Sequence, residues 1–215
     1  MSSFIPVSIT GLVTAVIDLS SMYSLRTCVV LGLFATLVLS QACQQTRDPA
    51  SQASSPWDTL PVLRGVSSFV GRDQDSAEFR ADALKGRPWI ASFFFSRCGT
   101  VCPALNTALA GIYREFSSKV AFVSLTSDPE YDTPSVLREY ATRYGAQRSS
   151  WAFVNMPLDS MISVSSNDLG LVSPAEPDLH STRFVLVDSA MQVRGYFDSA
   201  EASDVEKLRA ILKAL

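Results

Sequence analysis

The sequence predicts an α/β fold, a three-layer α/β/α sandwich with a mixed central sheet. From about residue 62 onward, short apolar runs rich in β-forming residues alternate with segments whose apolar residues recur at helical spacing, which is the pattern of an α/β domain. One run, Trp89–Phe95, is apolar throughout, as expected of a strand buried on both faces. No internal repeat and no second linker divides this region, so a single domain is expected.

The first half of the domain contains a possible strand pair, the central strand and a helix. Val62–Val70 predicts an early hairpin or strand pair. After the Trp89–Phe95 strand, a helix is expected to begin near Cys102, because Pro103 suits a first helical turn, where its missing N–H would have no partner anyway. The apolar residues that recur at helical spacing along this helix are Leu105, Leu109, Ile112 and Phe116.

The second half continues the alternation of strand and helix. Val120–Leu125 predicts the next strand, and Pro134 begins a helix that runs to about Tyr144, with Asp132 or Thr133 as its cap. The remaining predicted elements are a strand at 151–154, a helix at 158–165, strands at 183–187 and 193–197, and a closing helix with Val205, Leu208, Ile211 and Leu212 on one face. This order of elements is that of a thioredoxin-like domain, in which the loop after the first central strand carries the chemistry.

The charge of the chain argues against one class of partner. Lysine and arginine total 18 against 21 acidic residues, the formal net charge is -3, and no basic stretch is present. Nucleic-acid binding needs a basic patch that neutralises phosphates. We therefore expect no nucleic-acid partner.

The N-terminal residues 1–43 have the layout of an export signal. A basic residue precedes a nearly unbroken apolar run, Cys28–Leu39, and small residues lead to Cys43. The run is shorter than the roughly 20 residues that a membrane-spanning helix needs. The residues before Cys43 resemble a bacterial lipoprotein box, so lipidation of Cys43 is expected. An ordinary cleaved signal is the alternative, and either Met1 or Met22 could be the start of the chain.

A polar tether is expected to join this signal to the domain. Residues 44–60 are rich in Ser, Ala and Pro, a composition that buries too little apolar surface to order itself. The predicted organisation is an export signal at 1–43, a flexible linker at 44–60 and the domain at 61–215. We expect an exported, membrane-anchored protein facing the periplasm or the cell exterior. Cys98 and Cys102 would then be the only thiols of the mature domain, in an oxidising compartment.

The segment Cys98-Gly-Thr-Val-Cys102 contains two potentially reactive or metal-binding side chains close together. Cys98 is expected in the exposed loop and Cys102 at the helix start, where unpaired N–H groups and the helix dipole favour a thiolate. Two sulfurs this close in sequence can form a disulfide, serve as a redox pair or bind a soft metal. Their spacing differs from the Cys-x-x-Cys of thioredoxin-type oxidoreductases, which is a point against a dedicated disulfide exchanger. A structural disulfide or two inert thiols are the structural alternative.

His180 is the only histidine of the chain. It stands just before the predicted strand at 183–187, and loops beside strand ends are where α/β domains gather their site residues. Two thiolates and an imidazole suit copper, whereas zinc would lack a fourth ligand for a closed structural site. Cys98, Cys102 and His180 are therefore the candidate metal ligands, and a surface histidine without this role is the alternative.

Four stretches of the chain are specific together in their order and spacing. They are FFFSRCGTVCPALN with its Cys-x3-Cys-Pro, VAFVSLTSDPEYDTPSVLREYATRYGA with its Asp-Pro turn and Asp-Thr-Pro helix start, the tryptophan at Trp151, and HSTRFVLVDSAMQVRGYFD. On these stretches, roughly Pro61–Leu215 resembles the Sco/SenC family of copper-binding, thioredoxin-like assembly proteins for cytochrome c oxidase.

The resemblance implies a ligand set and a partner. Members of the family bind Cu(I) or Cu(II) through two thiolates and one imidazole, which match Cys98, Cys102 and His180. They deliver copper to, or reduce the cysteines of, the dinuclear copper site of oxidase subunit II. The chain departs from the family at Gly99-Thr100, where Pro-Asp is frequent, so a nearby carboxylate is missing and the copper affinity and redox potential are left open.

The expected function is that of a copper metallochaperone, with cytochrome c oxidase subunit II or another copper-accepting protein as its partner. Turnover of a small substrate is not required. One alternative is a thiol-disulfide oxidoreductase, in which Cys98 attacks, Cys102 resolves and His180 is dispensable. Another is a redox sensor that reports through oxidation of the same pair.

Overall fold

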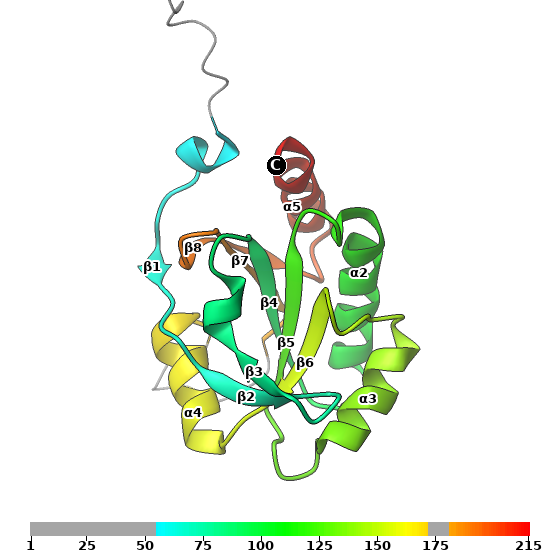
Figure 1. Cartoon of the computed structure of the whole chain (residues 1–215). Helices are drawn as coiled ribbons and strands as arrows, with labels where there is room; N and C mark the ends of the chain where they lie inside the picture. The colour runs from blue at the N-terminus through cyan, green and yellow to red at the C-terminus, as the bar shows by residue number, and fades with distance from the viewer. Residues whose placement is uncertain (1–54, 172–180) are drawn as a thin grey trace, which may run out of the picture. The chain divides into compact units, whose positions relative to one another are not determined.

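The computed structural model describes residues 55–171 and 181–215. In this part of the chain, eight strands form one sheet in the order β1-β8-β7-β4-β5-β6-β2-β3 (Figure 1). The strands are β1 (Arg64–Gly65), β2 (Val70–Asp73), β3 (Glu78–Arg80), β4 (Trp89–Phe94), β5 (Ala121–Thr126), β6 (Trp151–Asn155), β7 (Arg183–Val187) and β8 (Gln192–Asp198). The pairs β4–β5 and β5–β6 are parallel and the other neighbouring pairs are antiparallel. The predicted mixed sheet is confirmed.

Helices cover both faces of this sheet (Figure 1). On one face lie α2 (Val101–Phe116), α3 (Pro134–Arg143) and α5 (Ala202–Ala214). On the other face lie a short 3-10 helix η3 (Ala81–Leu84), α4 (Leu158–Ser163) and the π-helical turn η4 (Val164–Asp168). Each layer has its own apolar cluster against the sheet, so the predicted α/β/α sandwich is confirmed.

The predicted central strand, Trp89–Phe95, corresponds to β4 within one residue. All six residues of β4 are buried; Trp89 and Phe93 point into one apolar cluster and Ile90 and Phe94 into the other, as the alternation of a strand requires. The helix expected near Cys102 begins one residue earlier, and its four predicted apolar residues are buried. Prediction and structure differ by at most one residue at each end of β5, α3, β6, β7 and β8.

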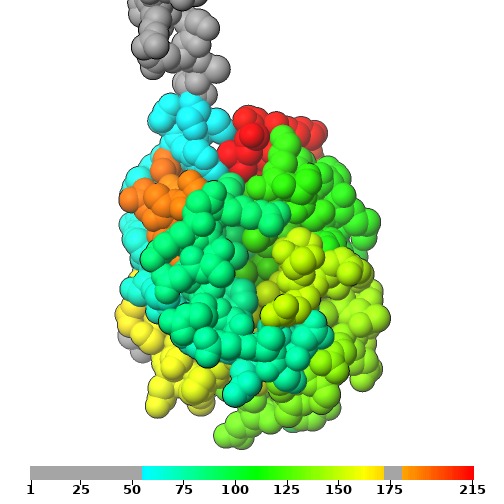
Figure 2. All heavy atoms as spheres, in the orientation of Figure 1, coloured from blue at the N-terminus to red at the C-terminus, as the bar shows by residue number. Residues whose placement is uncertain are grey.

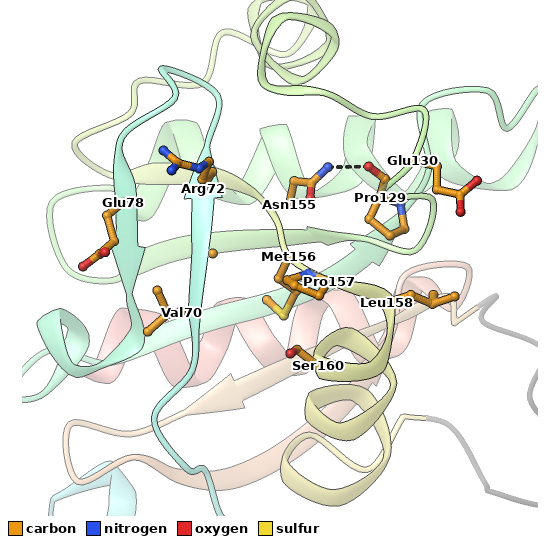
Figure 3. Close-up of a pocket in the computed structure, with 11 residues that line it drawn as sticks. Val70, Arg72, Glu78, Pro129, Glu130, Asn155, Met156, Pro157, Leu158 and Ser160 are labelled. Carbon is orange, nitrogen blue, oxygen red and sulfur yellow. Dashed lines mark hydrogen bonds between the residues drawn. The ribbon is translucent and has the colours of Figure 1, made fainter.

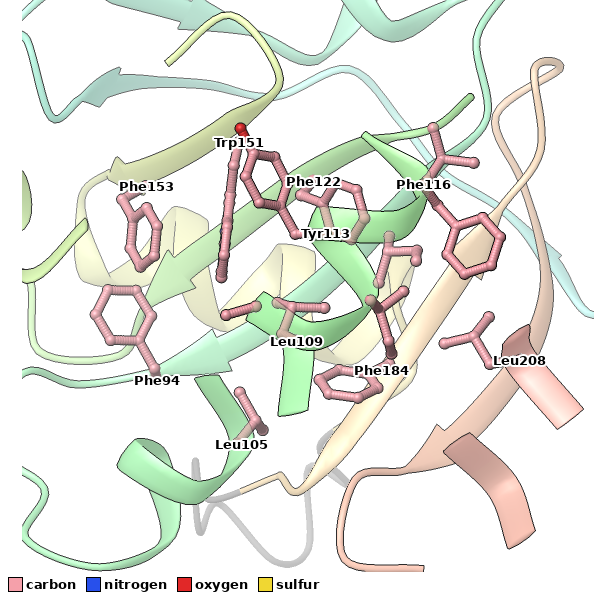
Figure 4. Packing of buried hydrophobic residues seen from close by; sticks show 14 of the residues in the cluster. Phe94, Leu105, Leu109, Tyr113, Phe116, Phe122, Trp151, Phe153, Phe184 and Leu208 are labelled. Atoms are coloured by element: carbon pink, nitrogen blue, oxygen red, sulfur yellow. The ribbon is translucent and has the colours of Figure 1, made fainter. Parts of the chain in front are cut away.

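Aromatic side chains fill the layer between the sheet and α2 (Figure 4). Trp151 lies at the start of β6 and is fully buried. Its ring stacks on Phe153 at 5.1 Å between centroids and lies 5.1 Å from Tyr113. The indole N–H donates to the Ser124 hydroxyl at 2.9 Å, so the one polar atom of this ring is satisfied inside the core.

The strand pair predicted at Val62–Val70 is wrong in its placement. Within that stretch β1 covers two residues, and it pairs with the distant β8 instead of forming a hairpin. The hairpin is formed by β2 and β3, with Val70 opposite Arg80. Its turn is stabilised by the Asp73 carboxylate, which accepts the N–H groups of Asp75 at 2.9 Å and Ala77 at 3.0 Å. Such a turn depends on one side chain, which the apolar pattern does not reveal.

Residues 55–60, at the end of the predicted linker, pack on the domain. They contain a 3-10 helix, η2 (Pro56–Thr59), and in Figure 2 they are the cyan atoms beside the orange and red segments. The Arg194 guanidinium donates to the carbonyls of Trp57 and Leu60, and pairs with Asp188 at 2.8 Å. The predicted signal at 1–43 and the rest of the predicted linker lie outside the described residues. Within 55–171 and 181–215, no helix is long and apolar enough to span a membrane.

Gly86 supplies a conformation that other residues adopt at a cost. It joins η3 to β4 with φ at 87° and donates its N–H to the Ser189 carbonyl at 2.9 Å. We expect Gly86→Ala to lower the free energy of unfolding by about 1 kcal/mol, from backbone strain alone, because no atom lies within 4 Å of the added methyl group. Urea denaturation measures this.

Gly65→Ala is the matched control for this substitution. Its added methyl group also meets nothing within 4 Å, but its φ lies outside the left-handed range. The free energy of unfolding should therefore change by less than about 0.5 kcal/mol. Equal losses in the two variants would show that the left-handed backbone is not the cause.

Candidate metal centre

The two cysteines lie where β4 ends and α2 begins. Cys98 is half-buried in the connecting loop, and Cys102 is buried in the first turn of the helix. Both are free thiols, and the Cys102 N–H donates to the Cys98 sulfur at 3.3 Å. The side chain of the N-cap residue, Thr100, makes no capping hydrogen bond, so the Cys98 sulfur takes the part of a capping atom. The sequence prediction for the placement of this pair is therefore matched by the structure.

The loop makes Cys98 the more acidic thiol. Burial acts to raise its pKa, but hydrogen bonds from the backbone N–H groups of Cys102, Thr100 and Val101 and from the Cys102 thiol outweigh it. The pKa of Cys98 therefore lies below its ordinary value, because these donors stabilise the thiolate.

Cys102 has the opposite environment. Burial raises the pKa of its thiol to about 12, and the hydrogen bond to Cys98 and the nearby charges of Cys98 and Asp132 act in the same direction. At neutral pH the pair consists of a buried thiol that donates to a more exposed and more acidic sulfur. Cys98 is therefore the reactive member of the pair, and the expectation that the helix start favours a thiolate at Cys102 is wrong, because burial outweighs the helix N-terminus there.

Alkylation should resolve the two thiols by pH. A lowered pKa means that Cys98 gains thiolate character below the pH at which an ordinary thiol ionises, whereas Cys102 stays protonated until about pH 12. In a chain with Cys28 and Cys43 changed to serine, iodoacetamide should label Cys98 first, with a rate that rises with pH through the lowered pKa. Peptide mass spectrometry measures the sites. Under denaturing conditions both should react alike; faster labelling of Cys102 in the folded protein contradicts this assignment.

An ion pair and an aromatic ring flank the exposed side of the loop. Arg97, directly before Cys98, donates to the Asp128 carboxylate at 3.0 Å, and its guanidinium lies 4.3 Å from the centre of the Tyr131 ring. Tyr131 is 47% exposed and Val101 is 43% exposed. The surface beside Cys98 is therefore open, and Arg97 on it is paired with a carboxylate.

Asp132 or Thr133 was predicted to cap the helix that begins at Pro134, which is α3. Thr133 is the N-cap residue, but its side chain makes no capping hydrogen bond. The Asp132 side chain turns away from the helix and accepts the Ser96 N–H at 3.0 Å. The cap assignment for Asp132 is therefore wrong, because its carboxylate has stronger partners across the sheet edge. The sequence did contain a signal that Asp132 lies near the site, because Asp132 follows a parallel strand at the sheet edge where the cysteine loop is expected.

A cavity of about 750 Å³ lies beside Pro129 and Glu130, in the segment between β5 and α3 (Figure 3). Pro129 and Glu130 form one wall, while β2, Glu78 of β3 and residues of the 155–160 segment, from the end of β6 into α4, form the others. In Figure 3 the Asn155 amide bridges to the Pro129 carbonyl, at 2.8 Å. Cys98 and Cys102 are not among its lining residues.

His180, the third predicted ligand, lies outside the described residues. In 55–171 and 181–215, no group of three or more His, Cys, Asp and Glu side chains is arranged to bind a metal. The structure thus brings together Cys98 and Cys102, and the three-ligand set stays a prediction. Two sulfur donors side by side match the chemistry of a soft metal such as copper.

Fold and site together define a thioredoxin-like protein with a Cys-x3-Cys dithiol at a strand-to-helix junction. A family model described as SCO1/SenC matches residues 60–152. The SCO1 protein homolog of Bacillus subtilis is 25% identical over 198 residues, which cover 86% of this chain and 96% of that protein. This chain is therefore similar to members of the SCO1/SenC family.

Solved structures show the same similarity. A SCO1/SenC family lipoprotein from Bacillus anthracis superposes with a TM-score of 0.64 at 25% identity, over 72% of this chain and 96% of that one. Bradyrhizobium japonicum ScoI, solved with copper bound, superposes with a TM-score of 0.57 over 71% of this chain and 99% of that one. At 20% identity the second likeness is evidence for the fold alone.

Proposed function

We propose that this chain is a copper metallochaperone in which Cys98 and Cys102, with His180, hold the ion for delivery to another protein. The observation that carries the proposal is the pair of sulfurs at the junction of β4 and α2, one half-buried and one buried, linked by the hydrogen bond from the Cys102 N–H to Cys98. Thiolates are the ligands that Cu(I) prefers. The copper-bound ScoI of Bradyrhizobium japonicum has the same fold.

The unequal exposure of the two sulfurs suits transfer. Cys98 is accessible, so an acceptor thiolate can attack the copper ion on its side of the site, whereas Cys102 is only 5% exposed. Copper would pass by ligand exchange: the acceptor sulfur binds as the Cys98 sulfur leaves, and Cys102 releases the ion last. Each thiol gives up its proton to solvent when the ion binds and regains one when it leaves. No small substrate is consumed.

The topology supports His180 as the third ligand. β7 runs antiparallel to β4, with Val185 opposite Ala91, so β7 begins at the edge of the sheet where β4 ends and the cysteine loop starts. His180 is three residues before Arg183 and is tethered within about 10 Å of it by chain length. An imidazole there would add the nitrogen donor that Cu(II) accepts more readily than a dithiol alone.

The proposed partner is cytochrome c oxidase subunit II or another copper-accepting protein, as the family resemblance implies. The proposed location is a membrane facing the periplasm or the cell exterior, with the exported chain anchored through its N-terminus. The Bacillus anthracis relative carries the description of a lipoprotein, which agrees with the cysteine at position 43 at the end of the predicted signal.

Transfer of copper tests this function. The chain, loaded with one Cu(I), would be mixed anaerobically with the reduced, metal-free copper domain of an oxidase subunit II. Copper should move to the acceptor, and separation of the two proteins followed by metal analysis measures it. The control is Cu(I)-glutathione at the same total copper. Copper that stays on the chain, or moves no faster than from glutathione, contradicts delivery.

The unequal pair of thiols also favours a second function, reduction of a partner disulfide. Cys98 is the more acidic and more accessible thiol and Cys102 lies beside it, which is the arrangement of an attacking and a resolving cysteine. If this is the activity, disulfide exchange with the oxidised acceptor should proceed at a rate that is unaffected by copper and by His180→Ala. A redox sensor would use the same two sulfurs without such a partner.

A further inference from the structure

Asp132 is the exception among the buried carboxylates of the described chain. Asp73, Asp132 and Asp188 are the buried acidic residues in 55–171 and 181–215. Asp73 pairs with Arg148, and Asp188 with Arg194. Asp132 is fully buried, and no lysine or arginine of the described residues lies within ion-pair distance of it. A buried carboxylate without a cation is costly unless hydrogen bonds satisfy it.

Hydrogen bonds from two strand ends satisfy this carboxylate. Ser96, which follows β4 and precedes the cysteine loop, donates its backbone N–H at 3.0 Å, and its hydroxyl also contacts the carboxylate. The hydroxyl of Thr126, the last residue of β5, donates to the same group. Bonds to an ionised acceptor in a buried site are the stronger kind. The side chain therefore ties the end of β4 to the end of β5.

A third strand end holds the backbone of Asp132. The side-chain amide of Asn155, the last residue of β6, donates to the Asp132 carbonyl at 2.7 Å and to the Pro129 carbonyl at 2.8 Å. Because β4, β5 and β6 are parallel, their ends meet at one edge of the sheet. Asp132 is thus hydrogen-bonded to residues at the ends of all three strands, and one of them, Ser96, lies two residues before Cys98.

We propose that Asp132 is the positioning residue of the Cys98–Cys102 loop. Its two bonds to Ser96 fix the chain two residues before Cys98, while α2 fixes Cys102, so the loop is anchored at both ends and the two sulfurs are held within reach of each other. Holding both donors in place lowers the entropy lost when they bind one ion or close one disulfide. The part of this proposal that concerns copper rests on the proposed function, and the part that concerns the sulfurs does not.

Two measurements on the full chain, with Cys28 and Cys43 changed to serine, test it. The first measurement uses no metal and is the equilibrium of the protein with glutathione. In this reaction the dithiol and one glutathione disulfide give the protein disulfide and two glutathione thiols. Its equilibrium constant reports the effective concentration of the Cys98 sulfur as seen by the Cys102 sulfur. The second is Cu(I) affinity by competition with a chelator. Asp132→Asn keeps the size of the side chain but removes its charge and one acceptor oxygen. It should lower both quantities about ten-fold or more.

Ser96→Ala and Asp188→Asn complete the design. Ser96→Ala removes one bond to Asp132 and keeps the carboxylate, so both quantities should fall in the same direction by a smaller factor, about three-fold. Asp188 is a buried aspartate that accepts two N–H bonds at 2.9 Å in the β7–β8 turn, next to Val187, which pairs with the first residue of β4. Asp188→Asn should lower stability but change neither quantity.

The outcomes separate the two claims. A folded Asp132→Asn chain with unchanged glutathione equilibrium overturns the positioning role, as does an equal change in Asp188→Asn. If Asp132→Asn does not fold, judged by circular dichroism, Ser96→Ala decides, and an unchanged equilibrium overturns the role. If the wild-type chain binds no copper, the proposed function fails while the glutathione equilibrium still tests Asp132.

Discussion

Changing either Cys98 or Cys102 to serine is expected to lower Cu(I) affinity by about 10²- to 10⁴-fold. The two sulfurs lie side by side at the start of α2, so the second sulfur binds the ion within one molecule, and this factor is the usual gain from such a link. A serine hydroxyl is a hard donor and replaces a soft thiolate poorly. Competition with a Cu(I) chelator under anaerobic conditions measures the affinity.

Two further variants show whether this loss is specific to sulfur. Thr100→Ala changes the residue between the cysteines whose side chain makes no capping hydrogen bond, so Cu(I) affinity should change little. His180→Ala should chiefly weaken Cu(II) binding, because two thiolates suffice for Cu(I). Retention of full Cu(I) affinity in either cysteine variant is incompatible with a two-thiolate site.

Trp151→Ala is expected to cost about 3–5 kcal/mol of the free energy of unfolding, the usual loss for a large buried aromatic residue. The side chain is fully buried between α2 and the sheet, in contact with Tyr113, Phe122 and Phe153. Removal of the indole ring leaves a cavity, and the Ser124 hydroxyl loses the N–H group that donates to it. A chain this destabilised should unfold at a much lower urea concentration than the wild type.

The control for this loss is an exposed aromatic residue. Tyr131 is 47% exposed, and Tyr131→Ala should change the free energy of unfolding by less than about 0.5 kcal/mol. Trp151→Phe should lie between the two, since it keeps most of the buried volume but loses the hydrogen bond. A loss below about 1 kcal/mol in Trp151→Ala would mean that the packing around this ring is not what stabilises the domain.

The fold could be predicted wherever local pattern and burial agree. β4 and β5 are buried along their whole length, and a continuous apolar run is their direct signature. The β2–β3 hairpin was missed because its strands are short and mostly polar. Part of its attachment is made by a side chain: Gln74 donates to the Trp151 carbonyl at 3.0 Å and accepts the Phe153 N–H at 2.8 Å. A glutamine that continues a strand ladder leaves no periodic signal in the sequence.

The part of the site formed by residues close together in the sequence could be predicted. Cys98 lies in the loop after β4 and Cys102 lies in the first turn of α2, four residues later, so their spacing and the predicted helix start were enough to place both sulfurs. The role of Asp132 is not local, because it depends on Ser96, Thr126 and Asn155, which come together only when three parallel strands end at one edge. The local sequence, an aspartate just before Thr-Pro, favoured a helix cap instead. His180 stays a prediction, outside the described residues.

Copper stoichiometry of the reduced wild-type chain tests the central claim most directly. The full chain, with Cys28 and Cys43 changed to serine, would be loaded with Cu(I) anaerobically, passed over a chelating resin and analysed for copper and for free thiols. The metallochaperone function predicts one copper per chain and two thiols protected from labelling. A chain that retains no copper while both thiols react would contradict it and would leave thiol-disulfide exchange as the function of this site.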